Sequence, residues 1–306
     1  MADRQPLKSA QQDSRPRWAF PPLGTRAPGG TQTVPPPPRC WRAVSLSDLP
    51  EPGAPPPPGP DDPRRWLGAT ALLDLEDPRL RVRARSLTQL CKTEREKVLS
   101  VYAFVKRLPF TKPLKLQPRT ARQVLDAGRG DSPDKATLLV ALLRSAGIPA
   151  RLHWYEFNGE VMRGLVPSLS SGGRPAVEVW AQGRWVGTDT YIFDAAYMAA
   201  ARQRLKDLGW TWGYGIHREG HAIWNGLDGA WVGGSPPAED PMVLEDHGCY
   251  DDVLAFSASE AYRKRRRPLT RSLHWNMVAP LMERAIRELR AGDGPASPPQ
   301  AERETS

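Results

Sequence analysis

The sequence predicts one domain of mixed α and β structure between two polar ends. Three observations predict it. Residues 135–146 form a strongly apolar run of helical length, which Gly147 terminates. Two apolar runs flank the pair Gln182 and Gly183, which is typical of a β-hairpin. The first 63 residues hold 17 of the 33 prolines, so this end cannot bury enough apolar surface to fold compactly.

Five segments carry helix signals. Thr93 and Glu96 form a capping box, and the apolar residues that follow recur on one face. Pro280 should interrupt or kink the last segment, because proline removes a helical hydrogen bond. The expected helices are residues 93–106, 120–126, 135–146, 194–208 and 273–289.

Strands are expected at residues 150–157, 176–180 and 184–188, where apolar residues alternate or flank a turn. Residues 209–250 are rich in glycine and tryptophan, and their pattern indicates neither a helix nor a strand clearly. Eight of the 11 tryptophans fall between Trp154 and Trp275, so the aromatic part of the core is expected in this half.

The composition divides the chain into an arm over residues 1–62, a domain over 63–290 and a tail over 291–306. The arm should be disordered with polyproline II character. A proline-rich ligand for an adaptor domain is one interpretation of it, and a plain tail is the favoured one. The tail is also expected to be disordered.

The bulk numbers exclude several classes of protein. The chain has no apolar stretch of about 18 residues, so no membrane span is expected. Its start shows no signal peptide, and Cys40, Cys91 and Cys249 are too far apart for a disulfide framework, which favours a cytoplasmic protein. The net charge of +9 suggests only weak affinity for polyanions.

One segment carries a specific resemblance. Residues 128–151 read GRGDSPDKATLLVALLRSAGIPAR. This text closely resembles the nucleophile helix of transglutaminase-like proteins, in which G-x-C precedes a polar pair and an apolar helix ending in L-R-x-x-G-I-P-A-R. The resemblance extends more thinly over residues 65–262. It implies an α+β, papain-like fold with helices packed on a small antiparallel sheet.

The resemblance also assigns three catalytic positions. The family places a cysteine at the start of the helix, a histidine four residues before the glutamate of a V-E-V strand, and an acid after the next strand. The matching residues here are Ser132, Arg174 and Asp189. Two of the three catalytic residue types are therefore replaced.

These replacements should prevent the usual thiol chemistry. A serine hydroxyl needs a neighbouring base, and a guanidinium cannot accept a proton. Asp189 alone is too weak a base at neutral pH. Ser132 also makes a good N-cap before Pro133, and this structural role is favoured over a nucleophile. Arg174 either pairs with Asp189, which would suit binding of an anionic group, or lies on a mobile glycine-rich loop.

The other candidate residues favour structural roles. His153 is expected to be a core or edge residue, and His217 with His221 lies in non-helical text that argues against a zinc site. Cys249 and His247 could form a Cys–His pair or half of a metal site, but a buried thiol beside a loop histidine is favoured. No cofactor motif occurs, so neither a cofactor nor a metal is predicted.

The dense basic run at residues 263–267 is interpreted as a solvated helix end, so no specific nucleic-acid partner is expected. The favoured function is a transglutaminase-like domain protein without Cys–His–Asp thiol chemistry, acting by binding a protein or peptide. The alternative is an amide-bond hydrolase or acyltransferase that uses Ser132 or a recruited base. A third hypothesis is a scaffold that recruits partners through the arm and the basic run.

Overall fold

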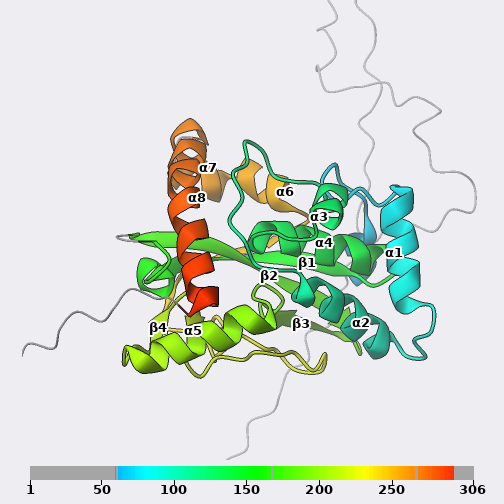
Figure 1. Cartoon of the computed structure of the whole chain (residues 1–306). Coiled ribbons are helices and arrows are strands. Elements are labelled where there is room, and N and C mark those ends of the chain that lie inside the picture. The colour runs from blue at the N-terminus through cyan, green and yellow to red at the C-terminus, as the bar shows by residue number, and fades with distance from the viewer. Residues whose placement is uncertain (1–58, 60, 167–168, 266–267, 293–306) are drawn as a thin grey trace, which may run out of the picture. The chain divides into compact units, whose positions relative to one another are not determined.

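The computed structural model describes residue 59 and residues 61–166, 169–265 and 268–292. Helices pack on a four-stranded antiparallel sheet with strand order β3-β2-β1-β6 (Figure 1). The strands are β1 (Ala150–Asn158), β2 (Ser171–Ala181), β3 (Arg184–Thr188), β6 (Val243–Tyr250), and a separate pair, β4 (Trp212–Gly213) and β5 (Ile216–His217). The predicted α+β class, with helices on a small antiparallel sheet, is confirmed.

The described helices occupy most of the predicted helical segments. The α-helices are α1 (Pro78–Thr88), α2 (Glu94–Arg107), α3 (Ala121–Ala127), α4 (Ser132–Ser145), α5 (Ala195–Asp207), α6 (Val253–Ala258), α7 (Glu260–Arg265) and α8 (Pro268–Ala291). Two 3-10 turns are η2 (Pro63–Leu67) and η3 (Gly159–Met162). Helix α1 was not predicted, although Asp77 caps it and Pro78 opens it.

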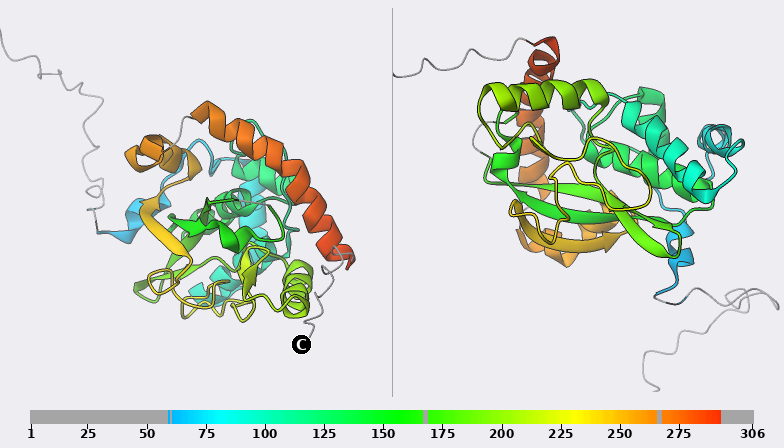
Figure 2. Two further views of the ribbon diagram at one scale, coloured as in Figure 1. Left: turned by 90° about the vertical axis from the view of Figure 1, so that its left-hand side faces the viewer. Right: turned by 90° about the horizontal axis from the view of Figure 1, so that it is seen from below.

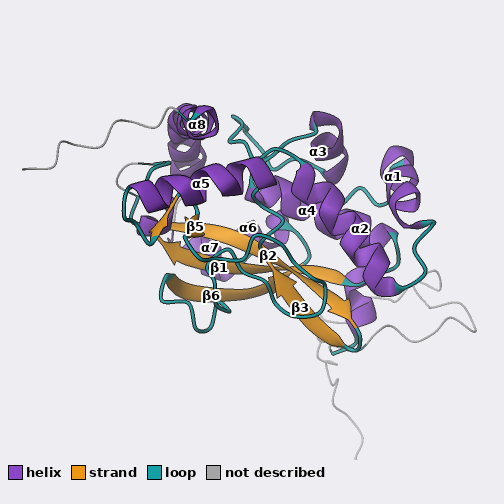
Figure 3. Cartoon of the chain, turned by 60° about the horizontal axis from the view of Figure 1, so that its bottom comes forward, coloured by secondary structure: helices purple, strands orange, loops and turns teal. Residues whose placement is uncertain are grey.

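Helix α4 is the central element of the core. Every residue from Asp134 to Arg144 is buried, as its nearly continuous apolar sequence requires. It packs on β1 and β2, and α1, α2 and α3 pack around it. Figure 3 shows α2, α4 and α5 on one side of the sheet. The start of α4 is therefore fixed by packing on several sides.

The hairpin between β2 and β3 forms at the predicted turn. Gln182 and Gly183 both have positive φ, 53° and 77°, which is the backbone of a two-residue turn that fits the sheet twist. Strand β2 begins at Ser171, five residues before the predicted start. Arg174 therefore lies within a strand, and the prediction of a mobile loop was wrong.

Strand β6 was missed in the sequence. It pairs with β1 along one edge of the sheet, with two irregularities in register. Its residues are mostly half-buried, and many of them are polar. The sequence therefore lacks the alternation of apolar and polar residues that would have marked a strand. The two irregularities also shift the register between β6 and β1, which a regular alternation of residues would not show.

Helix α8 runs from Pro268 to Ala291 with Pro280 inside it, so the interruption predicted as one of two outcomes at Pro280 does not occur. The helix lies beside α5 (Figure 1; Figure 2). Its Arg290 donates through Nη1 to Asp194 Oδ1 at 3.0 Å, and Asp194 is the N-cap of α5. This ion pair joins the C-terminal helix to the domain.

The predicted arm falls almost wholly outside the described residues, as does most of the predicted tail, so both stay predictions. The basic run is described only as far as Arg265, where α7 ends. No helix in the described ranges has both the length and the apolar character needed to cross a membrane.

Candidate functional site

Helix α4 begins one residue earlier than the predicted N-cap implies. Asp131, not Ser132, is the N-cap, and Ser132 is the first helical residue. Asp131 Oδ1 accepts from Asp134 N at 3.2 Å, and Asp134 Oδ2 accepts from Asp131 N at 3.4 Å. Aspartate and serine cap equally well, and this reciprocal capping box selects the aspartate. Ser132 is thereby released from capping.

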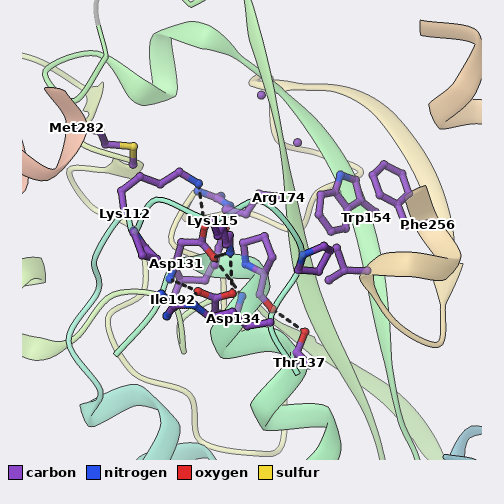
Figure 4. A pocket seen from close by; sticks show the side chains of 18 of the residues that line it. Lys112, Lys115, Asp131, Asp134, Thr137, Trp154, Arg174, Ile192, Phe256 and Met282 are labelled. Carbon is purple, nitrogen blue, oxygen red and sulfur yellow. Dashed lines mark hydrogen bonds and ion pairs between the residues drawn. The ribbon is translucent and has the colours of Figure 1, made fainter. Parts of the chain in front are cut away.

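Two lysines from a preceding connection neutralise this helix start. Lys112 Nζ lies 2.8 Å from Asp131 Oδ2. Lys115 Nζ lies 2.7 Å from Asp131 Oδ1 and 2.6 Å from Asp134 Oδ1. Figure 4 shows these four side chains directed toward one another. The two carboxylates are almost fully buried, so the lysines offset a charge that the interior would otherwise disfavour.

The cluster shifts the pKa values of its members in opposite directions. Burial raises the pKa of Asp134 to about 6, and the charge of Asp131 adds to this rise. Burial alone would raise the pKa of Asp131 too, but Lys112 and Lys115 hold it well below its usual range. Burial disfavours the charged Lys115 amine, yet the two aspartates raise its pKa overall. Lys115 is therefore held protonated.

The connection that carries the lysines is held down by α8. Lys112 N donates to Glu283 Oε2 at 2.7 Å. Lys115 N donates to Asn276 Oδ1 at 3.1 Å, and Asn276 Nδ2 donates back to Lys115 O at 3.1 Å. These bonds join residues more than 160 positions apart. The C-terminal helix therefore positions charges at the start of α4.

Arg174 and Asp189 form a buried ion pair, as one of the two sequence interpretations predicted. Arg174 Nη2 lies 2.8 Å from Asp189 Oδ2, and Nη1 donates to Gly215 O at 2.8 Å. Asp189 Oδ1 accepts from Val232 N at 2.8 Å. Burial raises the pKa of Asp189, and Arg174 opposes that rise. Arg174 also lies over the Phe157 ring, with Cζ 4.3 Å from the centroid.

Ser132 and Arg174 line the same cavity, which has a volume of about 290 Å³. Asp189 does not line it and reaches it only through Arg174. Most other walls are apolar and aromatic, with lysines and aspartates at one end. The lining includes Phe110, Lys112, Lys115, Arg119, Asp131, Trp154, Phe157, Val161, Met162, Leu169, Ile192, Phe193, Phe256 and Met282.

Three buried N–H donors at the cavity wall have no hydrogen-bond partner in the described part of the chain. They are Trp154 Nε1, Arg174 Nε and Arg119 Nη1, the last of which lies 3.7 Å from Asp134 Oδ2. The Trp154 ring stacks on Phe256 with centroids 4.1 Å apart, which fixes its position (Figure 4). A buried donor without a partner costs about 1–3 kcal/mol. No pattern in the sequence marks Trp154, Lys112 or Lys115, because their roles depend on contacts between distant segments.

The described side chains provide no imidazole at this cavity. His153 lies on the sheet, bonded to Glu178 and Asp246. His217 is on β5, and the pair His217 and His221 is not helical, as predicted. Within the described residues the Ser132 hydroxyl makes no hydrogen bond. The described residues that line the cavity can therefore offer a ligand hydrogen-bond donors and apolar contacts.

Comparison with family models matches part of the chain. Residues 81–190 match the model of the Transglutaminase-like superfamily, so this stretch is a transglutaminase-like domain. The match contains α4, β2 and β3, with the positions Ser132, Arg174 and Asp189. Comparison with curated proteins gives no match.

Two solved structures are similar to this chain. One is assigned as a candidate cysteine protease from Cytophaga hutchinsonii, with 20% identity and a TM-score of 0.35 over 50% of this chain and 44% of that chain. The other is a candidate protease from Parabacteroides distasonis, with 21% identity and a TM-score of 0.30 over 41% of this chain and 26% of that chain. The matched regions span less than half of either solved chain.

Proposed function

We propose that this transglutaminase-like domain binds a peptide in the cavity beside α4 and does not perform Cys–His–Asp thiol chemistry. The observation that carries the proposal is Arg174, whose Nη2 lies 2.8 Å from Asp189 Oδ2 at the position where the resemblance requires a histidine. A guanidinium stays protonated at any pH at which the protein folds, so it cannot take a proton from Ser132.

The Lys115 amine does not replace the missing base. The pKa of Lys115 is raised by Asp131 and Asp134 although burial opposes this, so its amine carries no free lone pair at neutral pH. A serine hydroxyl is weakly acidic and reacts only when a base removes its proton. These charges support a binding role for the start of α4.

The walls of the cavity indicate the kind of ligand. Apolar and aromatic side chains form most of it, which suits an apolar peptide side chain. The unpaired N–H groups of Trp154 and Arg174 would be satisfied by an acceptor, such as a peptide carbonyl or a terminal carboxylate. A peptide supplies both an apolar side chain and acceptors.

Binding is tested with short peptides that carry apolar residues and a free carboxylate, using thermal shift followed by calorimetry. Trp154→Phe keeps the ring on Phe256 but removes the N–H, and should weaken binding roughly 5- to 10-fold, as expected for one lost hydrogen bond. Trp185→Phe is the matched control, because Trp185 packs on Trp180 and does not line the cavity. Equal affinities for the two variants would contradict the proposal.

Catalysis is tested separately with an active-site fluorophosphonate probe. The proposal expects no labelling of the full chain beyond that of Ser132→Ala. Labelling that depends on Ser132, together with amide cleavage lost in Ser132→Ala, would support the alternative of an amide-bond hydrolase.

A further inference from the structure

Three side chains from neighbouring strands meet on the sheet away from the cavity. His153 lies on β1 directly opposite Cys249 of β6. Glu178 of β2 lies opposite Arg151, two residues before His153 on the same face of β1. The residues between them, such as Leu152, point the other way into the core around α4. The cluster therefore follows from strand register.

We propose that His153, Glu178 and Cys249 form a binding site for a divalent metal ion, with zinc as the best-matched ion. One ligand atom from each residue lies within 4.8 Å of the other two. His153 Nδ1 is 2.7 Å from Glu178 Oε1, and Cys249 Sγ is 3.6 Å from Glu178 Oε2. Imidazole, thiolate and carboxylate are the ligand types that zinc takes, and three protein ligands leave one position for water.

The groups behind these three ligands match the outer shell of a metal site. His153 Nε2 lies 2.6 Å from Asp246 Oδ1, so Asp246 can hold one ring N–H and leave Nδ1 for the ion. Tyr155 stacks on the imidazole with centroids 4.3 Å apart and fixes the ring plane. Arg151 Nε donates to Glu178 Oε2 at 2.6 Å, which leaves Oε1 as the ligand atom.

Charge and access also suit a cation. Glu178 and Asp246 carry two carboxylates, and Arg151 offsets the charge of one of them. The side chains of His153 and Glu178 are 15% and 14% exposed, while Asp246 is 57% exposed and opens the cluster to solvent. Binding displaces the thiol proton and any second proton on the imidazole. A doubly protonated His153 bridging two carboxylates would need no metal, and the experiment separates the two states.

The site is tested by titrating Zn²⁺ into the full chain in competition with a chromophoric chelator. The background carries Cys40→Ser and Cys91→Ser, so Cys249 is the remaining thiol. One equivalent should bind, and Co²⁺ in its place should show a thiolate-to-cobalt absorption band. Cys249→Ser should remove the band and weaken binding by at least about 10-fold.

A second variant acts without touching a proposed ligand. Asp246→Asn changes an exposed residue and should weaken Zn²⁺ binding about 10-fold while it keeps the cobalt band. Cys91→Ser in the natural chain is the matched control and should change nothing, since the Cys91 thiol donates to the Leu87 carbonyl at 3.6 Å and is not part of the cluster. The proposal is overturned if the background chain binds no Zn²⁺ against the chelator, or if Cys249→Ser binds it equally well.

Discussion

Arg174 and Asp189 form an ion pair with Nη2 2.8 Å from Oδ2, between strand β2 and the first residue after β3. Both side chains are at least nine-tenths buried. The sequence resemblance places a histidine and an acid at these two positions. The pair keeps that cross-strand relationship but replaces a group that exchanges protons with one that does not. The pair should therefore act chiefly on the free energy of unfolding.

The first prediction concerns this pair. Arg174→Met should destabilise the fold by about 3–5 kcal/mol, because it leaves the Asp189 carboxylate buried without a cation. Adding Asp189→Asn should recover at least about 1 kcal/mol, since asparagine is neutral and can still accept from Val232 N. Guanidinium unfolding measures both.

The exposed pair of Arg284 and Glu288, four residues apart on α8, is the control for that experiment. Arg284→Met should change the unfolding midpoint little, as for other surface pairs. If the two changes at Arg174 and Asp189 were simply additive, the buried pair would not behave as a coupled unit.

The second prediction restores the family residues. Ser132→Cys places a thiol at the start of α4, and Arg174→His adds an imidazole beside Asp189. The double variant should react with iodoacetamide at least about 10-fold faster than Ser132→Cys alone, because an imidazole can deprotonate the thiol. Mass spectrometry of the peptide that contains position 132 measures the rate.

The matched control for this gain is Ser132→Cys with Arg174→Gln, which also removes the guanidinium but supplies no base. Similar rates for the glutamine and histidine variants would show that a residue at position 174 does not accept the proton of the thiol at position 132. Unchanged unfolding midpoints between the variants keep the comparison valid.

Local patterns in the sequence were sufficient for the central elements. The apolar run of α4, closed by Gly147, and the turn at Gln182 and Gly183 each depend on a few neighbouring residues, and both form as predicted. The start of α4 was misplaced by one residue because Asp131 and Ser132 are equally good caps. Only the reciprocal bond with Asp134 distinguishes them.

Long-range contacts account for what the sequence did not predict. Lys115 reaches the start of α4 because Asn276, 161 residues later, fixes its backbone. The sequence suggested only its neighbour His247 as a possible partner for Cys249, whereas strand register places Cys249 opposite His153. A single sequence carries no pattern for such pairings, because they depend on how separate elements pack.

The third prediction concerns pH and Asp134. Burial, with the charge of Asp131, raises the pKa of Asp134 in the folded state from 3.8 to about 6. The folded state therefore binds more protons than the unfolded state in this range, and stability from this group is lost as pH rises through about 6. Between pH 4 and 7.5, Asp134→Asn should gain about 2 kcal/mol of stability relative to the natural protein.

Denaturant unfolding at the two pH values measures this difference. Asp126→Asn is the control, because Asp126 is half-exposed and pairs with Arg122 on the surface of α3. Its effect should be nearly the same at both pH values. A constant difference for Asp134→Asn as well would mean that Asp134 titrates normally in the folded protein.

The last prediction concerns Lys135, which is completely buried within α4. Its Nζ donates to Leu108 O and Ile192 O, each at 2.8 Å, and so joins two connections to the central helix. Lys135→Met leaves both carbonyls without this donor and should cost about 2–4 kcal/mol. Burial places the pKa of Lys135 well below its usual range, so its contribution to stability should increase as pH rises toward the unfolded value of 10.5.

The destabilisation caused by Lys135→Met should therefore be larger at pH 9 than at pH 7, as measured by guanidinium unfolding. Lys206→Met is the matched control, because Lys206 is exposed on α5, and its small effect should not depend on pH. A cost for Lys135→Met that is the same at pH 7 and pH 9 would mean that the buried amine stays charged over this range. In that case the carbonyls of Leu108 and Ile192 would be stabilising an ammonium ion in the core.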